Sequence, residues 1–238
     1  QQRALVYQRA KNVSDTNAFG TLDDLYAKDK EWFLQSQTSQ PLDVQDFRIT
    51  VGNERCLQPY SMSVFNISAM SFGSLSGRAI MALNQGAKMG GFAHDTGEGA
   101  ISPYHRKYGG DLIWQLGTGY FGCRDENGNF DPELFAQNAT DDQVKMIEIK
   151  LSQGAKPGKG GVLPAEKITK EIALTRRIPM AEDCISPSTH SAFNTPRELV
   201  HFWQQLRELS GGKPVGIKLC IGQPWQFMAI VKAMIEED

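Results

Sequence analysis

The sequence predicts an α/β fold assembled from parallel βα units, and three observations support this class. From residue 63 onward, short apolar runs alternate with amphipathic stretches of about 10 to 15 residues, as strands alternate with helices. Polar and glycine-rich segments follow the predicted strands, where ligands bind in barrels and in open sheets. No GxGxxG motif opens a helix after a strand, so a (β/α)8 TIM barrel is favoured over a dinucleotide-binding sheet.

Residues 1–60 are expected to form an irregular, partly helical lead-in. Its clearest element is a helix over residues 21–36, with Thr21 as a candidate N-cap and two acidic residues in the first turn. Residues 61–238 are then expected to form the N-terminal portion of the barrel.

The elements expected in the barrel portion follow in order along the chain. Strands are expected at residues 63–68, 91–95, 111–116, 145–152, 181–187 and 214–220. Helices are expected at residues 77–91, 164–177, 196–209 and 224–237. The first helix has Ser74 or Ser76 as its N-cap and a glycine pair at its end, and the third has Thr195 as its N-cap before Pro196.

The composition sets limits on partners and compartment. The chain has 25 Lys and Arg against 27 Asp and Glu, so its charge gives no argument for nucleic acid or an anionic membrane. No apolar run approaches the roughly 20 residues that cross a bilayer. The four cysteines lack CxxC or iron–sulfur spacing, and the histidines lack metal-ligand spacing, which indicates a reducing, cytoplasmic compartment and no metal.

The segment LSQGAKPGKGGVLP, residues 151–164, contains four glycines and two lysines. Glycine backbone and lysine charge together can hold an anion, and an exposed turn has the same composition. The pattern GxxxxGK[ST] is not met, because Gln153 stands five residues before Gly158 and Gly160 follows Lys159. The segment is therefore not a nucleoside triphosphate loop.

Six segments occur in the order found in the flavin-binding barrel of glutamate synthases: AMSFGSLS, HDTGEG, IWQLGTGYFG, QGAKPGKGGVLP, ISPSTH and VGIKLC. The chain resembles glutamate-synthase-type FMN-binding proteins over roughly residues 60–225, and QGAKPGKGGxLP is the most specific element. In that family a barrel holds FMN, and the reduced flavin delivers hydride to 2-iminoglutarate, formed from 2-oxoglutarate and ammonia. The resemblance implies an oxidoreductase of glutamate biosynthesis that acts on CH–NH2 groups, with separate electron-donor and ammonia-supplying proteins. A homo-oligomer is compatible with it.

The resemblance assigns Ser71, Phe72, Gly73, Gln115 and Lys218 to the flavin. Lys218 stands in an apolar strand, where a cation would stabilise negative charge on the N1 and C2 carbonyl edge of the reduced ring. A lysine in the barrel interior, paired with a carboxylate, is the alternative. The amide of Gln115 can donate and accept hydrogen bonds, while a tight βα turn explains Gly73 equally well.

The resemblance also assigns residues to a substrate with two carboxylates, which needs fixed cations and amide donors. Gln153, Gly154 and Lys156 are implied in substrate binding, and Arg176 in binding the distal carboxylate. Glu98 and Lys156 are implied as catalytic residues beside flavin and substrate. The alternative for Arg176 is a cation that decorates a helix C-terminus.

Five positions depart from the family pattern. His94 and Asp95 stand where serine and asparagine are usual, Ser188 and Thr189 stand where prolines are usual, and Lys159 stands where a glutamate is common. These departures leave open a flavin barrel that acts on another amino or hydroxy acid.

The histidines have separate expectations. His94 is either a proton donor to the imine or a structural residue, and His190 follows another strand. His105 and His201 are expected at the surface.

The strand count is short of a barrel, because about six candidates are found where eight are needed. Family glycine motifs for the flavin phosphate also lie downstream of the matched region. We therefore expect the chain, which begins with Gln1, to be part of a longer protein and to bind FMN weakly or not at all alone, with its last parallel strand covered by an oligomeric contact or a rearrangement. A truncated, non-catalytic barrel module is the remaining alternative.

Overall fold

The structure is a computed structural model that describes residues 2–14, 24, 26–29, 31, 34, 37–38, 47–152 and 160–237. The chain divides into two compact units, Gln1–Gln45 and Asp46–Asp238. The described part of the first unit contains helix α1 (Gln2–Ala10). The helix expected over residues 21–36 lies mostly outside the described residues and stays a prediction.

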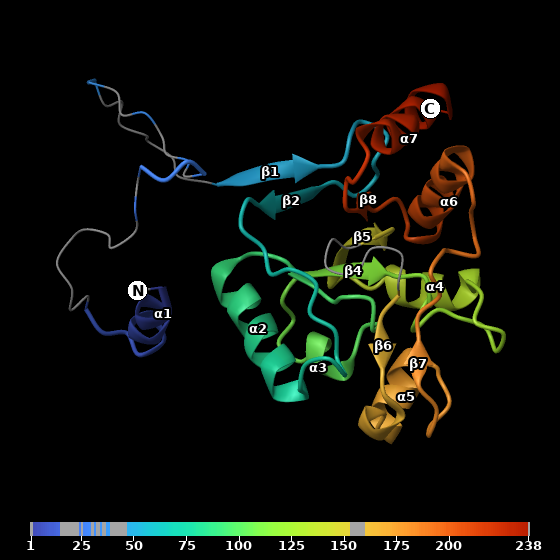
Figure 1. Cartoon of the computed structure of the whole chain (residues 1–238), viewed down its shortest axis with the longest axis horizontal. Helices are drawn as coiled ribbons and strands as arrows, with labels where there is room; N and C mark the ends of the chain where they lie inside the picture. The colour runs from blue at the N-terminus through green and yellow to red at the C-terminus, as the bar shows by residue number, and fades with distance from the viewer. Residues whose placement is uncertain are drawn as a thin grey trace. The chain divides into compact units, whose positions relative to one another are not determined.

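The second unit is built on a parallel sheet of four strands in the order β3-β4-β5-β8. Strands β4 and β5 lie side by side in Figure 1. These strands are β3 (His94–Asp95), β4 (Leu112–Leu116), β5 (Val144–Lys150) and β8 (Val215–Lys218). Helices α3 (Pro103–Arg106) and α4 (Pro132–Ala139) lie between successive strands, as in βα units. The α/β class with a parallel sheet is confirmed, whereas the strands in the described ranges do not close into a barrel.

The other helices of the second unit are α2 (Gly77–Gly90), α5 (Lys170–Arg176), α6 (Pro196–Leu209) and α7 (Pro224–Glu237). Helix α2 lies beside α3 (Figure 1) and also contacts β3. Helix α6 contacts α4, α7 and β8. The predicted caps are confirmed: Ser76 accepts a backbone N–H at the start of α2, and Gly91 ends this helix with φ 65°. Thr195 and Glu198 form a capping box at α6.

The helix expected over residues 164–177 is wrong in its first half. Residues Ala165–Lys167 form a short 3-10 helix, η1, and α5 begins only at Lys170. Ile168 between them is extended, with ψ 93°, and the Thr169 side chain accepts the N–H of Ile172 as a new N-cap.

The strand expected at residues 63–68 is also wrong, apart from an isolated parallel bridge between Ile67 and His94. Residue 63 instead ends β2 (Tyr60–Ser63), which pairs antiparallel with β1 (Arg48–Val51). The reason is a turn after β2, in which the side chain and carbonyl of Ser63 accept hydrogen bonds from Phe65 and Asn66.

The strand expected at residues 181–187 forms, but outside the parallel sheet. Its ordered part is β7 (Cys184–Ile185), which pairs antiparallel with β6 (Val162–Leu163). The Ser186 N–H extends this pairing by donating to the Gly161 carbonyl at 2.9 Å. The end of the glycine-rich segment therefore forms β6, and β7 pairs with β6 instead of joining the parallel sheet.

The strand register gives the parallel sheet one apolar and one polar face. Trp114, Leu116, Ile147 and Ile149 are buried in the core that includes Phe135 of α4 and Leu206 of α6. Because side chains alternate along strands, the other face carries Asp95, Gln115, Glu148, Lys150 and Lys218. Tyr60 and Met62 of β2 pack on this second face near the strand starts, against Ile113 and Met146. The polar side chains thus collect toward the carboxyl ends of the strands.

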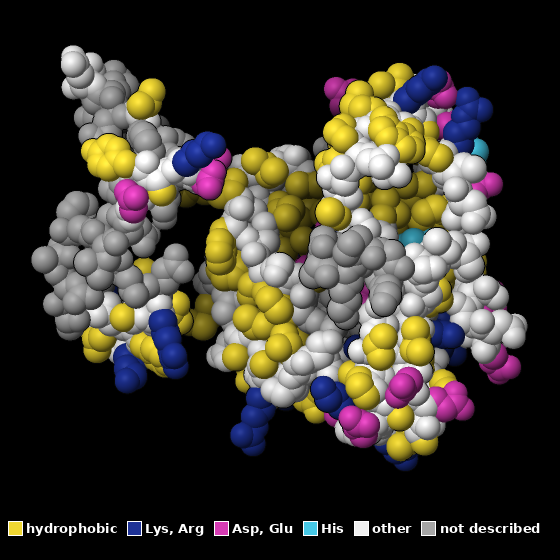
Figure 2. All heavy atoms as spheres, in the orientation of Figure 1, with side chains coloured by type: hydrophobic (Ala, Val, Ile, Leu, Met, Phe, Trp, Pro, Cys, Tyr) yellow, Lys and Arg dark blue, Asp and Glu magenta, His cyan; other side chains and the backbone are white. Residues whose placement is uncertain are grey.

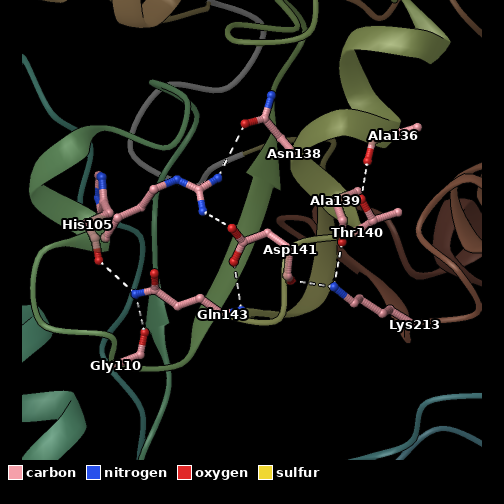
Figure 3. Close-up of polar contacts among 10 residues, drawn as sticks. His105, Gly110, Ala136, Asn138, Ala139, Thr140, Asp141, Gln143 and Lys213 are labelled. Atoms are coloured by element: carbon pink, nitrogen blue, oxygen red, sulfur yellow. Dashed lines mark hydrogen bonds and ion pairs between the residues drawn. The ribbon is translucent and has the colours of Figure 1, made fainter.

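A polar cluster fixes the opposite, amino ends of β5 and β8 (Figure 3). Lys213 is 3% exposed and donates to the carbonyls of Ala139 and Asp141, each at 2.6 Å. Asp141 also pairs with Arg106 at 2.6 Å, and the Gln143 amide donates to the carbonyls of His105 and Gly110. Burial lowers the pKa of Lys213. These bonds stabilise the turn between α4 and β5.

The expectation that His105 lies at the surface is wrong, because its side chain is fully buried. Its Nδ1 lies 2.8 Å from the Ser102 hydroxyl in a capping box, and its Nε2 lies 2.9 Å from the Met70 carbonyl oxygen. His201 is exposed, as expected, with its Nε2 2.8 Å from Glu237.

Apolar side chains gather on the outer surface of α7 (Figure 2), where Trp225, Met228 and Ile235 are 65%, 58% and 77% exposed. None of the helices within the described ranges combines the length and apolar character needed to cross a bilayer.

Candidate functional site

The candidate site is the polar face of the sheet at the carboxyl ends of its strands. Lys150 of β5 and Lys218 of β8 are direct partners in the strand register, and Gln115 of β4 is the partner of Glu148 of β5. Ligands bind at this edge in parallel α/β folds, because the loops that follow the strands meet there. The register therefore brings together two predicted flavin residues, Gln115 and Lys218, that lie about a hundred positions apart.

Glu98 forms an ion pair with Lys150, and its Oε2 lies 2.7 Å from Nζ. The side chains of Glu98 and Lys150 are 19% and 13% exposed. Two glycines enclose the carboxylate: a Cβ at Gly161 would lie 2.5 Å from Glu98 Oε1, and one at Gly117 would lie 2.8 Å from Glu98 Cβ. Gly161 belongs to the glycine-rich segment, so packing around Glu98 explains this glycine.

Lys150 is a site residue that the sequence reasoning missed. It alternates with apolar residues in the strand sequence KMIEIK, the same signal that singled out Lys218. Glu148 was missed with it, although it occupies the same face two residues earlier.

Gln115 lies between two carboxyl groups and is 1% exposed. Its Nε2 lies 2.5 Å from Glu148 Oε1 and 3.4 Å from Asp95 Oδ2. The Oε1 atom of Gln115 is buried and accepts no hydrogen bond from the residues that the structure describes. Burial, and then the Glu148 carboxylate, raise the pKa of Asp95 well above its usual value, against the opposing effects of the Gly97 N–H and of Lys218.

Lys218 is half-buried and contributes electrostatically to the Asp95 environment. It forms no ion pair within 4 Å with any carboxylate among the described residues. The alternative explanation for Lys218 was an ion pair with a carboxylate inside the barrel. Among the described residues, no such ion pair supports it.

Ser71, Phe72 and Gly73 form the turn that follows the Ile67 bridge. The Phe72 ring is 6% exposed and packs on Tyr104 at 5.0 Å between centroids. Gly73 has φ 102°, a conformation that favours glycine, so the turn explanation for this residue has direct support. Contact of these three residues with a flavin stays a prediction.

Arg176, near the end of α5, is 5% exposed. Its Nη2 donates to the Phe72 carbonyl at 3.0 Å, and its guanidinium lies over the Phe121 ring at 5.3 Å. Its Nε has no hydrogen-bond partner, and no carboxylate lies within ion-pair distance, among the described residues. The exposed cation that ends the helix is Arg177, with φ 58°.

The predicted residues Gln153, Gly154 and Lys156, together with Lys159, lie outside the described residues. Their roles stay predictions.

Two buried histidines, His190 and His94, lie near the parallel sheet. His190 is 5% exposed, with Nδ1 2.9 Å from the Tyr120 hydroxyl and Nε2 2.9 Å from the Lys150 carbonyl oxygen, and burial lowers its pKa. His94 is fully buried on the apolar face of the sheet, with its ring 5.2 Å from that of His105. This position favours the structural explanation for His94 over a proton-donor role.

A family model described as "Conserved region in glutamate synthase" matches residues 5–238. The chain belongs to the glutamate synthase family. The match confirms the resemblance drawn from the motifs and extends it into the lead-in, which the motifs did not cover.

Curated relatives agree with this membership. The chain is 42% identical over 196 residues to the glutamate synthase large subunit-like protein YerD of Bacillus subtilis, covering 82% of this chain and 36% of that protein. It is 36% identical over 178 residues to the archaeal glutamate synthase [NADPH] of Archaeoglobus fulgidus, covering 74% and 32%. A glutamate synthase large subunit-like protein of Rhizobium meliloti is 29% identical over 233 residues, covering 94% and 50%. The chain thus spans between about a third and a half of these relatives.

Proposed function

We propose that the chain carries part of the active site of a flavin-dependent oxidoreductase that converts 2-oxoglutarate and ammonia, through 2-iminoglutarate, into glutamate. The observation that carries this proposal is the polar face itself, where Gln115, Lys150 and Lys218 lie in register with Glu98 beside them. Membership of the glutamate synthase family supports it.

The residues on the polar face fit a flavin in two respects. Gln115 Oε1 is a buried acceptor without a partner among the described residues, and such an atom is costly unless a donor reaches it. Lys218 is a cation without an ion pair in the described part of the site, so it is free to stabilise negative charge on a ring edge. FMN, when bound, would supply the hydride. Ser71, Phe72 and Gly73 are proposed to complete its contacts.

The substrate is proposed to lie between the flavin and the cations of the surrounding loops. Arg176 would bind the distal carboxylate, since its guanidinium is buried with Nε unpaired among the described residues. Gln153, Gly154 and Lys156 would bind the rest of the keto acid, and Lys156 and Glu98 would act at the reacting carbon. Lys150 holds the Glu98 carboxylate in place through the 2.7 Å ion pair.

The barrel and its partners are part of the same proposal. Residues 61–238 would form the N-terminal portion of a (β/α)8 barrel behind the lead-in of residues 1–60, in a cytoplasmic enzyme. Separate proteins would supply electrons and ammonia.

Turnover by the photoreduced, flavin-loaded native protein tests this function. Glutamate must form from 2-oxoglutarate and ammonia, and it must fail to form when either substrate is omitted. A flavoprotein that makes no glutamate would favour the second candidate, a flavin barrel for another amino or hydroxy acid. The carboxyl pair at Asp95 and the exposed Ser188 and Thr189 are the observations that favour that candidate.

A further inference from the structure

Asp95 and Glu148 approach one amide nitrogen from two different strands. The Nε2 of Gln115 lies 2.5 Å from Glu148 Oε1 and 3.4 Å from Asp95 Oδ2, while the other Asp95 oxygen accepts the Gly97 N–H at 2.8 Å. An amide NH2 group has two donor hydrogens, so both can be directed at these carboxyl groups.

We propose that Asp95 and Glu148 are positioning residues that together fix the side-chain amide of Gln115. Their oxygens hold the NH2 end, so the carbonyl oxygen is the free hydrogen-bonding atom of the amide. With that oxygen buried and without a partner among the described residues, a ligand with an N–H donor would satisfy it. We call the arrangement of Asp95 and Glu148 around the Gln115 amide the clamp. The identity of the ligand rests on the proposed flavin function, whereas the clamp itself does not.

The pair is proposed to hold one proton. Two carboxylates beside a single amide repel each other, and Asp95 is only 6% exposed, so protonating one of them relieves both the repulsion and the burial of charge. The groups that face the pair are Gln115 from β4, Lys150 beside Glu148 on β5, and Lys218 from β8. Lys150 is already paired with Glu98, which leaves Lys218 as the compensating cation.

At position 95, one substitution can separate the proton from the shape of the side chain. An asparagine there has the shape of aspartate but cannot exchange a proton. The substitution Asp95→Asn therefore removes the shared proton with little change in side-chain volume. Glu148→Gln makes the matching change at the carboxyl group on β5.

Nuclear magnetic resonance titration of the 238-residue chain tests the clamp without any cofactor. The side-chain carboxyl of Asp95 should titrate well above its usual range, and the side-chain amide resonances of Gln115 should shift at the same pH. Glu148→Gln should lower the pH at which Asp95 titrates, because a neighbouring negative charge is removed. Asp95→Asn should remove the part of the Gln115 amide shift that accompanies the titration of Asp95, and the control Glu126→Gln should leave the titration of Asp95 and this shift unchanged.

The wild-type titration decides the question even if a substitution prevents folding. Titration of Asp95 within its usual range, or a Gln115 amide that shows no step, would overturn the clamp. FMN titration of the native protein separates this result from the proposed function: if the native wild type binds FMN, Asp95→Ala, which removes the acceptor that holds the Gln115 amide, should weaken binding by about tenfold, roughly the loss of one hydrogen bond. Absence of FMN binding by the native protein would contradict the flavin function while leaving the clamp to the resonance titration. Equal FMN binding by the native wild type and its Asp95→Ala variant would overturn the role of the clamp toward the flavin.

Discussion

The substitution Gly161→Ala should destabilise the protein by crowding Glu98. A Cβ at this position would lie 2.5 Å from Glu98 Oε1, whereas ordinary contact begins at 3.4 Å, so the carboxylate would have to move by about 0.9 Å. It cannot move freely, because Lys150 holds its other oxygen at 2.7 Å and Gly117 backs its Cβ at close range.

The expected magnitude follows from this restriction. Overpacking by one methyl group costs about 1 to 3 kcal/mol where the surroundings cannot relax. A matched control is Gly86→Ala in α2, where a new Cβ meets no atom within 4 Å. That exchange should stabilise the chain by about 0.5 to 1 kcal/mol, because alanine favours the helix.

Urea unfolding of both variants and the wild type would measure these free energies. A double-mutant cycle with Lys150→Met then tests the cause, since a Glu98 carboxylate released from Lys150 should accommodate the methyl group at lower cost. If Gly161→Ala is as stable as Gly86→Ala, or if its cost is unchanged with Lys150→Met, the close packing of Gly161 on a fixed Glu98 is refuted.

Four further predictions follow from the caps, the buried histidine and the proposed site. Thr195→Ala should cost about 1 kcal/mol in urea unfolding by removing the α6 cap, while the exposed Ser188→Ala should cost almost nothing. Burial and His105 lower the pKa of His94 to about 4, so the unfolded chain binds more protons than the folded chain below about pH 6.5, and the free energy of unfolding should fall from there toward pH 4. Unfolding of His94→Leu across this range should show a smaller fall. An equal fall would exclude His94 as a source of the pH dependence. Lys156→Ala in the flavin-loaded native protein should weaken 2-oxoglutarate binding by about 1.5 to 3 kcal/mol and FMN binding far less, which equilibrium titrations of both ligands would check. Lys218→Ala should lower the flavin reduction potential, and an unchanged potential would remove Lys218 from the flavin edge.

The fold class could be predicted because its signals are local. Alternating apolar runs and amphipathic stretches predicted β3, β4, β5 and β8, and the caps of α2 and α6 depend on residues within one turn of each helix start. The errors arose where distant segments decide the outcome. Residues 184–185 lie outside the parallel sheet because they pair with Val162 and Leu163. No property of residues 181–187 alone reveals this contact.

The candidate site could be predicted only in part, for a related reason. Lys218 was recognised as a charge in an apolar strand, but Lys150 and Glu148 became site residues only when the register placed them beside Lys218 and Gln115. His105 was misplaced because its partners, Ser102 and the Met70 carbonyl, come from a cap and from a segment 35 positions away. The motif resemblance identified the family, and the strand register showed which site residues lie next to one another.

The visible absorption spectrum of the purified native protein tests the central claim most directly, because bound flavin gives bands that no side chain produces. We predict a flavin spectrum, with FMN released on denaturation, and a spectrum that changes when Lys218 or Gln115 is substituted. A native protein that shows no flavin bands and takes up no added FMN would contradict the claim that this polar face is a flavin site.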